Sequence, residues 1–263
     1  MSEHRRKGQI MSWEAQSLRL TLFLVSPVDG EKTNWWERLI GLPPEGKVSK
    51  PRINGYEESG LVDEIVGNQV RLRILIQPMR MDLLLTASPK DDLNTEVPPV
   101  IGPVSESLDR FGSLARKWLA FSDMPQVERM AFGAHLDEMV PDRKAGYGQL
   151  RQYLSRYVKI DPEGSSDFSY SINRPRASAS GIAELRVNRL SKWSVIIWSV
   201  MRHRISSASS EVFRDAERFS CHLELDISTN QDFREEIARE KLSFIYDELV
   251  ALGMEIAKDG DIP

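Results

Sequence analysis

The order of strand-like and helix-like patterns is the feature that most limits what this chain can fold into. Apolar residues recur at every second position at 18–25, 70–77 and 81–87, which predicts three strands before the first helix, at 105–121. A strand at 127–139 and a helix at 147–158 follow, and strands at 167–173, 184–190, 192–205 and 219–229 precede a helix at 231–257. Because the strands come in runs, the pattern indicates an α+β fold, with a mainly antiparallel sheet and about three main helices packed on it.

The C-terminal helix is expected to be amphipathic. Its apolar residues fall at the spacing of one helix face, and they are Leu242, Ile245, Leu249, Leu252 and Ile256, with Phe233 and Ile237 extending the stripe backward. Such a stripe predicts that this helix packs against the sheet.

One α+β domain is expected over residues 16–263, preceded by a flexible N-terminal arm at 1–15. The segment 88–103 is rich in Pro and Asp and is the clearest linker in the chain. It offers an alternative in which two β-rich halves divide near 88–104. No repeat aligns residue by residue, so the sequence leaves this alternative open.

Composition excludes several classes of protein. With 41% hydrophobic and 28% charged residues the chain is not of the disordered type, and its apolar stretches are far shorter than the roughly 18 residues that cross a membrane. Cys221 is the one cysteine, so no disulfide can form within the chain, and we expect this residue in the core. The charged N-terminus is not followed by the apolar segment of a secretory signal. These features predict a soluble cytoplasmic protein with no membrane partner.

Charge is distributed unevenly along the chain. Seven bases and one acid lie between residues 174 and 204, a net charge of +6, whereas residues 205–263 hold fourteen acids and six bases, a net charge of -8. The bases of the first segment are Arg174, Arg176, Arg186, Arg189, Lys192, Arg202 and Arg204. In one hypothesis they form a basic surface that binds nucleic acid or an acidic protein. In the other, the acidic last helix packs near the basic strands and neutralises them within the fold.

Sequence motifs of the common enzyme classes are absent. The four histidines lack the His-Glu-x-x-His spacing of zinc hydrolases, and no P-loop, dinucleotide-binding glycine motif or nucleophile elbow occurs. One polar row remains, because His222, Glu224 and Asp226 alternate with apolar residues and would share a strand face, with Cα atoms about 6.5–7 Å apart. Such a row can hold a divalent metal or supply an acid and a base, and it is also typical of the solvent side of a half-buried strand. We assign no metal or cofactor.

A pair of adjacent tryptophans, Trp35 and Trp36, lies in a long connection rich in Pro and Gly. Exposed tryptophan is typical of protein interfaces, which makes this pair a candidate partner-binding site. The alternative is that a short helix at 35–42 anchors both side chains in the core.

These features together favour a non-catalytic intracellular protein-interaction or assembly subunit, with another protein or a second copy of the chain as its partner. One alternative is nucleic-acid binding or processing through a basic face at 174–204. A second alternative is a metal-dependent enzyme that uses His222, Glu224 and Asp226.

Overall fold

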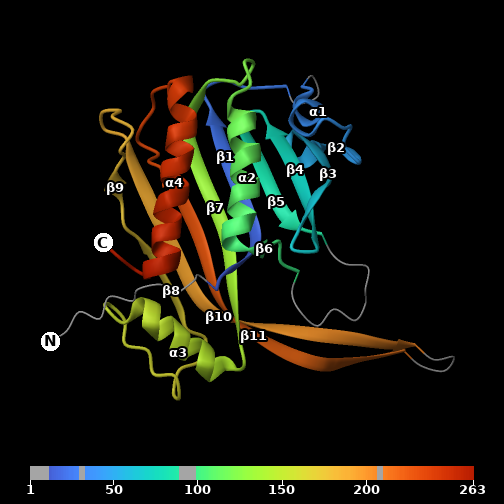
Figure 1. Cartoon of the computed structure of the whole chain (residues 1–263), viewed down its shortest axis with the longest axis vertical. Coiled ribbons are helices and arrows are strands. Elements are labelled where there is room, and N and C mark those ends of the chain that lie inside the picture. The colour runs from blue at the N-terminus through green and yellow to red at the C-terminus, as the bar shows by residue number, and fades with distance from the viewer. Residues whose placement is uncertain (1–11, 30–32, 89–98, 206–209) are drawn as a thin grey trace.

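A computed structural model describes residues 12–29, 33–88, 99–205 and 210–263. Its strands form a single antiparallel sheet in the order β2-β3-β4-β5-β1-β7-β11-β10-β8, with β6 paired to β1 and β9 paired to β10 (Figure 1). The strands are β1 (Glu14–Leu24), β2 (Gly46–Lys50), β3 (Gly55–Ile65), β4 (Asn68–Gln77), β5 (Arg80–Ala87), β6 (Gly102–Pro103), β7 (Val127–Val140), β8 (Ser169–Asn173), β9 (Arg176–Ala177), β10 (Arg186–Ile205) and β11 (Ser210–Thr229). The helices are α1 (Trp35–Ile40), α2 (Val104–Leu119), α3 (Arg143–Leu154) and α4 (Arg239–Asp259). The predicted α+β fold with a largely antiparallel sheet and a C-terminal helix is therefore confirmed.

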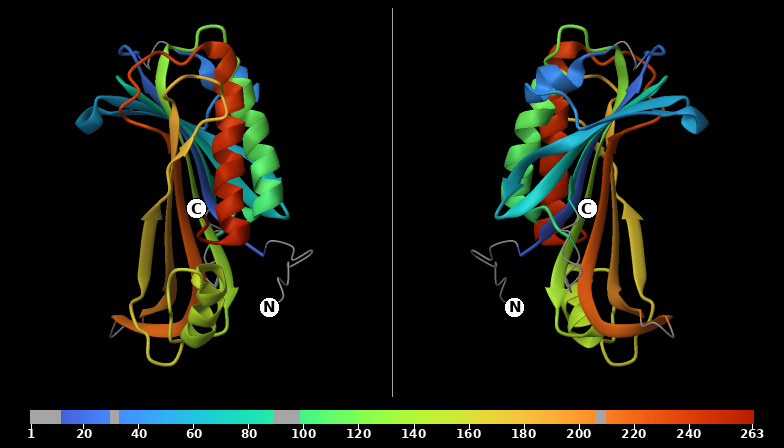
Figure 2. Two further views of the ribbon diagram at one scale, coloured as in Figure 1. Left: turned by 90° about the vertical axis from the view of Figure 1, so that its left-hand side faces the viewer. Right: turned by 90° about the vertical axis from the view of Figure 1, so that its right-hand side faces the viewer.

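The helices cover one face of the sheet, and the core lies between them and that face (Figure 2). Leu18, Leu20 and Leu22 of β1 occupy alternate positions, and all three are fully buried on this face. On α4, Gly253 packs against Phe132 of β7 and Leu225 of β11, where an added Cβ would lie 3.4–3.5 Å from their side chains. The alternating apolar residues of the strands thus determine which face the helices cover.

Several predicted boundaries differ from the structure. The segments 184–190 and 192–205 are one strand, β10, because Ser191 is buried within it and breaks neither pairing nor direction. β11 begins at Ser210 rather than near 219, and the long connection at 31–55 contains β2 and leads into β3, neither of which was predicted. α4 begins at Arg239 instead of 231. Phe233 and Ile237 are buried all the same, and Ile237 forms an isolated bridge with Val127.

The prediction of a flexible arm over residues 1–15 is wrong for residues 12–15. Residues 1–11 lie outside the described residues, but Glu14 and Ala15 already belong to β1. Trp13 is 1% exposed and its Nε1 donates a hydrogen bond to the carbonyl of Ala257, 2.8 Å away, because the indole packs under the end of α4. Residues 12–15 are therefore part of the folded body.

The strand order contains two similar series. On one side of the centre the order runs β1-β5-β4-β3, and on the other it runs β7-β11-β10-β8. Each series is followed in the chain by a long helix, α2 or α4. The division into two β-rich halves stays a prediction, and in this arrangement its boundary lies between α2 and β7. Most of the predicted linker, residues 89–98, lies outside the described residues.

No helix in the described part of the chain is long and apolar enough to cross a membrane.

Candidate functional site

The helix-free face of the sheet carries a small polar hollow, which we call the sheet-face pocket. Its volume is about 320 Å³, and it is lined by Ser17, Arg19, Leu84, Thr86, Gly133, His135, Glu224, Leu225 and Asp226. These residues come from β5, β1, β7 and β11, four adjacent strands at the centre of the sheet. The pocket is therefore assembled by strand pairing from four distant parts of the chain.

The register of the strands places the lining residues in two cross-strand rows. In one row Ser17 lies opposite Thr86 on one side and His135 on the other, and His135 lies opposite Glu224. In the second row Arg19 lies opposite Leu84 and Gly133, and Gly133 lies opposite Asp226. Hydroxyls and an arginine thus stand at one end of the pocket, and carboxylates stand at the other.

Arg19 lies across the neighbouring strand because Gly133 has no side chain. A Cβ on Gly133 would lie 3.3 Å from Nη2 of Arg19 and 3.4 Å from its Nε. Arg19 makes no hydrogen bond or ion pair with the described residues, and its Nε is buried without a partner. A guanidinium carries five N–H donors, so this side chain offers unused donors at the centre of the pocket.

A histidine pair borders the pocket. Nδ1 of His222 lies 3.2 Å from Oδ1 of Asp137, which is 1% exposed and also accepts a 2.8 Å hydrogen bond from Ser220. The rings of His135 and His222 meet edge to face with their centroids 5.6 Å apart. Partial desolvation, with the charges of His222 and Arg19, lowers the pKa of His135, while Glu224 and Asp137 oppose the shift. His135 therefore favours the neutral form.

The predicted row of His222, Glu224 and Asp226 does share one face of β11, but His222 and Glu224 have separate partners, and Asp226 has no hydrogen bond or ion pair with the described residues. His222 contacts Asp137, and Glu224 forms an ion pair with Lys192 at 3.6 Å. Among the described residues, no group of three or more His, Cys, Asp or Glu side chains is placed to hold a metal ion. The contact of His222 with Asp137 and the ion pair of Glu224 with Lys192 direct these two side chains toward different groups.

Three arginines of the basic segment are paired with the C-terminal part of the chain. Arg174 donates to Asp261 through both Nε and Nη2, and Tyr170 donates to the same carboxylate at 2.8 Å. Glu255 of α4 accepts from Nη1 of Arg176 at 2.9 Å and from Nη2 of Arg189 at 3.3 Å. The hydrogen bonds to Asp261 raise the pKa of Arg174, so its charge is held within the fold.

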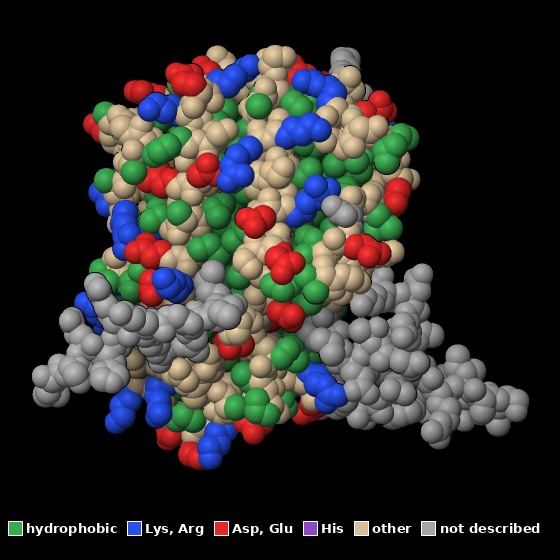
Figure 3. Space-filling model, in the orientation of Figure 1, with side chains coloured by type: hydrophobic (Ala, Val, Ile, Leu, Met, Phe, Trp, Pro, Cys, Tyr) green, Lys and Arg blue, Asp and Glu red, His purple; other side chains and the backbone are tan. Residues whose placement is uncertain are grey.

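The other bases of this segment have different surroundings. Arg186 is exposed, and Lys192 is exposed beside Glu224. Arg202 and Arg204 lie on β10, but their side chains are outside the described part of the structure. On the helix-covered face, blue and red side chains are interspersed rather than gathered in one patch (Figure 3).

Trp35 and Trp36 are core residues, which corrects the alternative that one of them is an exposed partner-binding anchor. They are 2% and 1% exposed, on the short helix α1. Trp35 packs edge to face on Trp118 of α2, and its Nε1 donates to Asp123 at 3.1 Å. Trp36 fills the space above Gly60 of β3, where an added Cβ would lie only 2.9 Å from Trp36 Cζ2. Their burial leaves no indole surface for a partner.

The hairpin of β10 and β11 extends beyond the rest of the sheet, and we call the extension the β-arm (Figure 1). β8 pairs with β10 only up to Ser194, and β7 pairs with β11 only from Phe219 onward. From there β10 and β11 pair only with each other, up to Ile205 and Ser210. Sequence reasoning missed this feature because it divided the strands. The available signal was the uncharged and mostly apolar stretch from Trp193 to Met201, which contains no proline or glycine.

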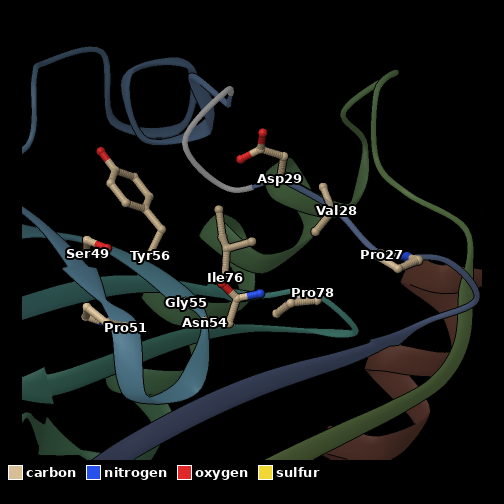
Figure 4. Close-up of a pocket in the computed structure, with 10 residues that line it drawn as sticks. All are labelled: Pro27, Val28, Asp29, Ser49, Pro51, Asn54, Gly55, Tyr56, Ile76 and Pro78. Atoms are coloured by element: carbon tan, nitrogen blue, oxygen red, sulfur yellow. The ribbon is translucent and has the colours of Figure 1, made fainter.

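Two other hollows lie near the ends of the sheet. One, of about 460 Å³, is formed by the segment after β1 and the turn between β2 and β3, with Asp29 and Tyr56 at its border (Figure 4). The other, of about 610 Å³, lies between the segments 182–184 and 230–235. Neither contains a histidine or a cysteine, and they offer less chemistry than the sheet-face pocket.

Comparisons with protein-family models, with curated proteins and with solved structures yield no match. The function must therefore be argued from the geometry alone.

Proposed function

We propose that this chain is a non-catalytic assembly subunit that associates with a second copy of itself through the outer edge of β10. The observation that carries the proposal is the β-arm. Over residues 195–205, no described strand pairs with the side of β10 that faces away from β11. An unpaired strand edge is a template for another strand, and monomeric proteins usually protect such edges.

The composition of this edge favours pairing. Residues 195–201 read Val-Ile-Ile-Trp-Ser-Val-Met, with no charge, no proline and no glycine. Ile197 is 40% exposed, and the extra residue of the one bulge in the arm is on β11, so β10 itself is regular. A two-stranded ribbon is only marginally stable in water, and a third strand would stabilise it.

A second copy suits this edge because the edge is self-complementary. In an antiparallel pairing about a twofold axis at Trp198, Val195 lies opposite Met201, and Ile197 lies opposite Ser199. No charged residue opposes another over this stretch. In this register Lys192 would fall opposite Arg204, but both lie outside the uncharged stretch, and at Lys192 the edge of β10 is already paired with β8.

Backbone direction identifies which amides face outward. The carbonyls of Arg189 and Leu185 accept hydrogen bonds from Arg174 and Ser178, on the outer side of β10. In a strand, residues two apart point their backbone groups to the same edge. The N–H of Ile197 and the N–H of Ser199 therefore face the open edge.

The test is the molar mass in solution, measured by light scattering during size-exclusion chromatography. We expect the wild-type chain to have twice its monomer mass of 30.0 kDa. Ser199→Pro removes one outward N–H and leaves the apolar side chains in place, so it should give a monomer. Ser199→Ala removes the same hydroxyl but keeps the N–H, and it should remain a dimer. A monomeric wild-type chain, or a dimer that persists in Ser199→Pro, would contradict the proposal.

Nucleic-acid binding remains an alternative function. Nucleic-acid binding would have to use Arg186, Lys192, Arg202 and Arg204, since Arg174, Arg176 and Arg189 have partners in the fold. We also propose a cytoplasmic location, which we infer from the presence of a single, buried cysteine, Cys221.

A further inference from the structure

We propose that the sheet-face pocket binds a small zwitterion, such as a free amino acid. Its carboxylate would bind the guanidinium of Arg19, and its ammonium group would face Asp226. This inference does not depend on the β-arm, because the pocket lies at the centre of the sheet, on β5, β1, β7 and β11.

The first argument is the state of Arg19. Its guanidinium lies over Gly133, and it makes no hydrogen bond or ion pair within the part of the chain that the structure describes. A buried donor without a partner destabilises a fold by about 1–3 kcal/mol, and a ligand that accepts a hydrogen bond from it would recover that loss. A planar fork of N–H donors matches a carboxylate in particular.

The second argument is the opposite end of the pocket. Asp226 likewise has no hydrogen bond or ion pair with the described residues. Burial lowers the pKa of Arg129, and the charge of Asp226 opposes that shift. Glu224 stands two residues before it and is neutralised by Lys192 at 3.6 Å. Arg19 and Asp226 thus line the same hollow of about 320 Å³, and within the described residues neither forms an ion pair with the other.

These two charges select against other ligands. An anion such as phosphate would bind Arg19 but would be repelled by Asp226, and a simple cation would be repelled by Arg19. A ligand that carries both charges on neighbouring atoms satisfies both ends and keeps the pocket neutral. Ser17, Thr86 and neutral His135 can add hydrogen bonds to the carboxylate. Leu84 offers an apolar contact, which favours a ligand with an uncharged side chain.

Isothermal titration calorimetry with each of the common free L-amino acids is the first experiment. We expect at least one with an uncharged side chain to bind in a saturable manner with a Kd below about 1 mM. Its N-acetyl derivative lacks the cation, and its carboxamide lacks the anion, so each should bind at least about tenfold more weakly. The absence of binding by all free amino acids, or equal binding of parent and N-acetyl derivative, would overturn the proposal.

Variants locate the binding. Arg19→Gln and Asp226→Asn should each weaken binding of that amino acid by at least about tenfold. Matched controls remove the same charges elsewhere, at the exposed residues Arg151 of α3 and Asp259 of α4, so Arg151→Gln and Asp259→Asn should bind like the wild type. Circular dichroism and thermal melting establish that each variant is folded. If folded Arg19→Gln binds as tightly as Arg151→Gln, the ligand does not occupy this pocket.

Discussion

The ion pair between Arg174 and Asp261 provides a direct test of whether the basic segment is neutralised within the fold. The side chain of Asp261 is 2% exposed, and that of Arg174 is 26% exposed. Asp261 accepts hydrogen bonds from Nη2 of Arg174 at 2.6 Å and from Tyr170 at 2.8 Å. The proposed perturbation is Asp261→Asn, which keeps the shape of the side chain and removes its charge.

The expected magnitude follows from burial. Removing one partner of a fully buried ion pair costs about 3–5 kcal/mol. Water reaches the partly exposed Arg174 and solvates part of the charge left behind, so we expect a loss of about 2–3 kcal/mol. For a chain of this size, that loss lowers Tm by roughly 4–12 °C.

The pH dependence has a definite sign. Burial alone would raise the pKa of Asp261, but the hydrogen bonds from Arg174 and Tyr170 outweigh it and hold the pKa below its usual value. A carboxyl whose pKa is lowered by folding stabilises the native state above its unfolded pKa. The difference in stability between wild type and Asp261→Asn should therefore be complete at pH 7 and disappear as the pH falls through the lowered pKa.

Urea unfolding followed by circular dichroism measures the effect, and a double-mutant cycle with Arg174→Gln isolates the pair. The double variant should lose less stability than the sum of the two single variants. Glu163→Gln is the control, because the ion pair of Glu163 with Lys144 is on the surface, and its removal should leave Tm unchanged. If Asp261→Asn is as stable as Glu163→Gln, the pair does not hold Arg174, and the basic segment is free for an external partner.

Three further predictions concern single residues. Gly260→Ala should unfold at a markedly lower temperature in a thermal melt, because Gly260 has φ +81° and a Cβ there would lie 2.0 Å from the carbonyl oxygen of Tyr153. Gly41→Ala is the control, since Gly41 has φ +84° but no neighbour within 4 Å, and it should lose only about 1–2 kcal/mol of stability. Equal losses in the two variants would refute the steric argument. Burial raises the pKa of Cys221 to about 12, so its thiol should not react with a disulfide reagent at pH 8 until the chain is unfolded in guanidinium. Rapid labelling of the native protein would contradict this burial. Partial burial, together with the charges of His222 and Arg19, lowers the pKa of His135, so the unfolded chain binds more protons near pH 6 and stability should fall as the pH drops from 7. His135→Gln should reduce that fall, and an unchanged urea–pH profile would refute the shift.

Local periodicity predicted the elements that pack against the core. The leucines of β1 and the apolar residues of α2 recur at regular spacing because each of these elements buries one face. The same reasoning missed β2 at the edge of the sheet, since Lys47, Val48 and Ser49 are all exposed and leave no buried alternation to detect. It also extended α4 too far, because Ile237 is buried through a strand-like bridge to Val127 rather than through a helix.

The site was predictable only in part, for a related reason. Alternation on β11 correctly placed Glu224 and Asp226 on one face of the sheet. Their neighbours His135 and Arg19 are contributed by β7 and β1, and only the strand order brings them together. Strand order is a property of the whole chain, so no local spacing in the sequence could have paired Arg19 with Gly133.

The uneven charge of the sequence has a structural explanation in the same strand order. Residues 174–189 run along one edge of the sheet, where the end of α4 and the C-terminal residues pack against them, so Glu255 and Asp261 meet Arg176 and Arg174 directly. Charges that lie far apart in sequence thus neutralise one another in space, and three of the seven bases of segment 174–204, namely Arg174, Arg176 and Arg189, have acidic partners within the fold. The two proposals depend on groups outside these ion pairs, the donors of Arg19 and the outer edge of β10. Because these two features are on different strands, Ser199→Pro should abolish self-association without weakening ligand binding, and Arg19→Gln should do the reverse. If one variant abolished both properties, the pocket and the edge could not be independent, and the two proposals would have to be replaced by one.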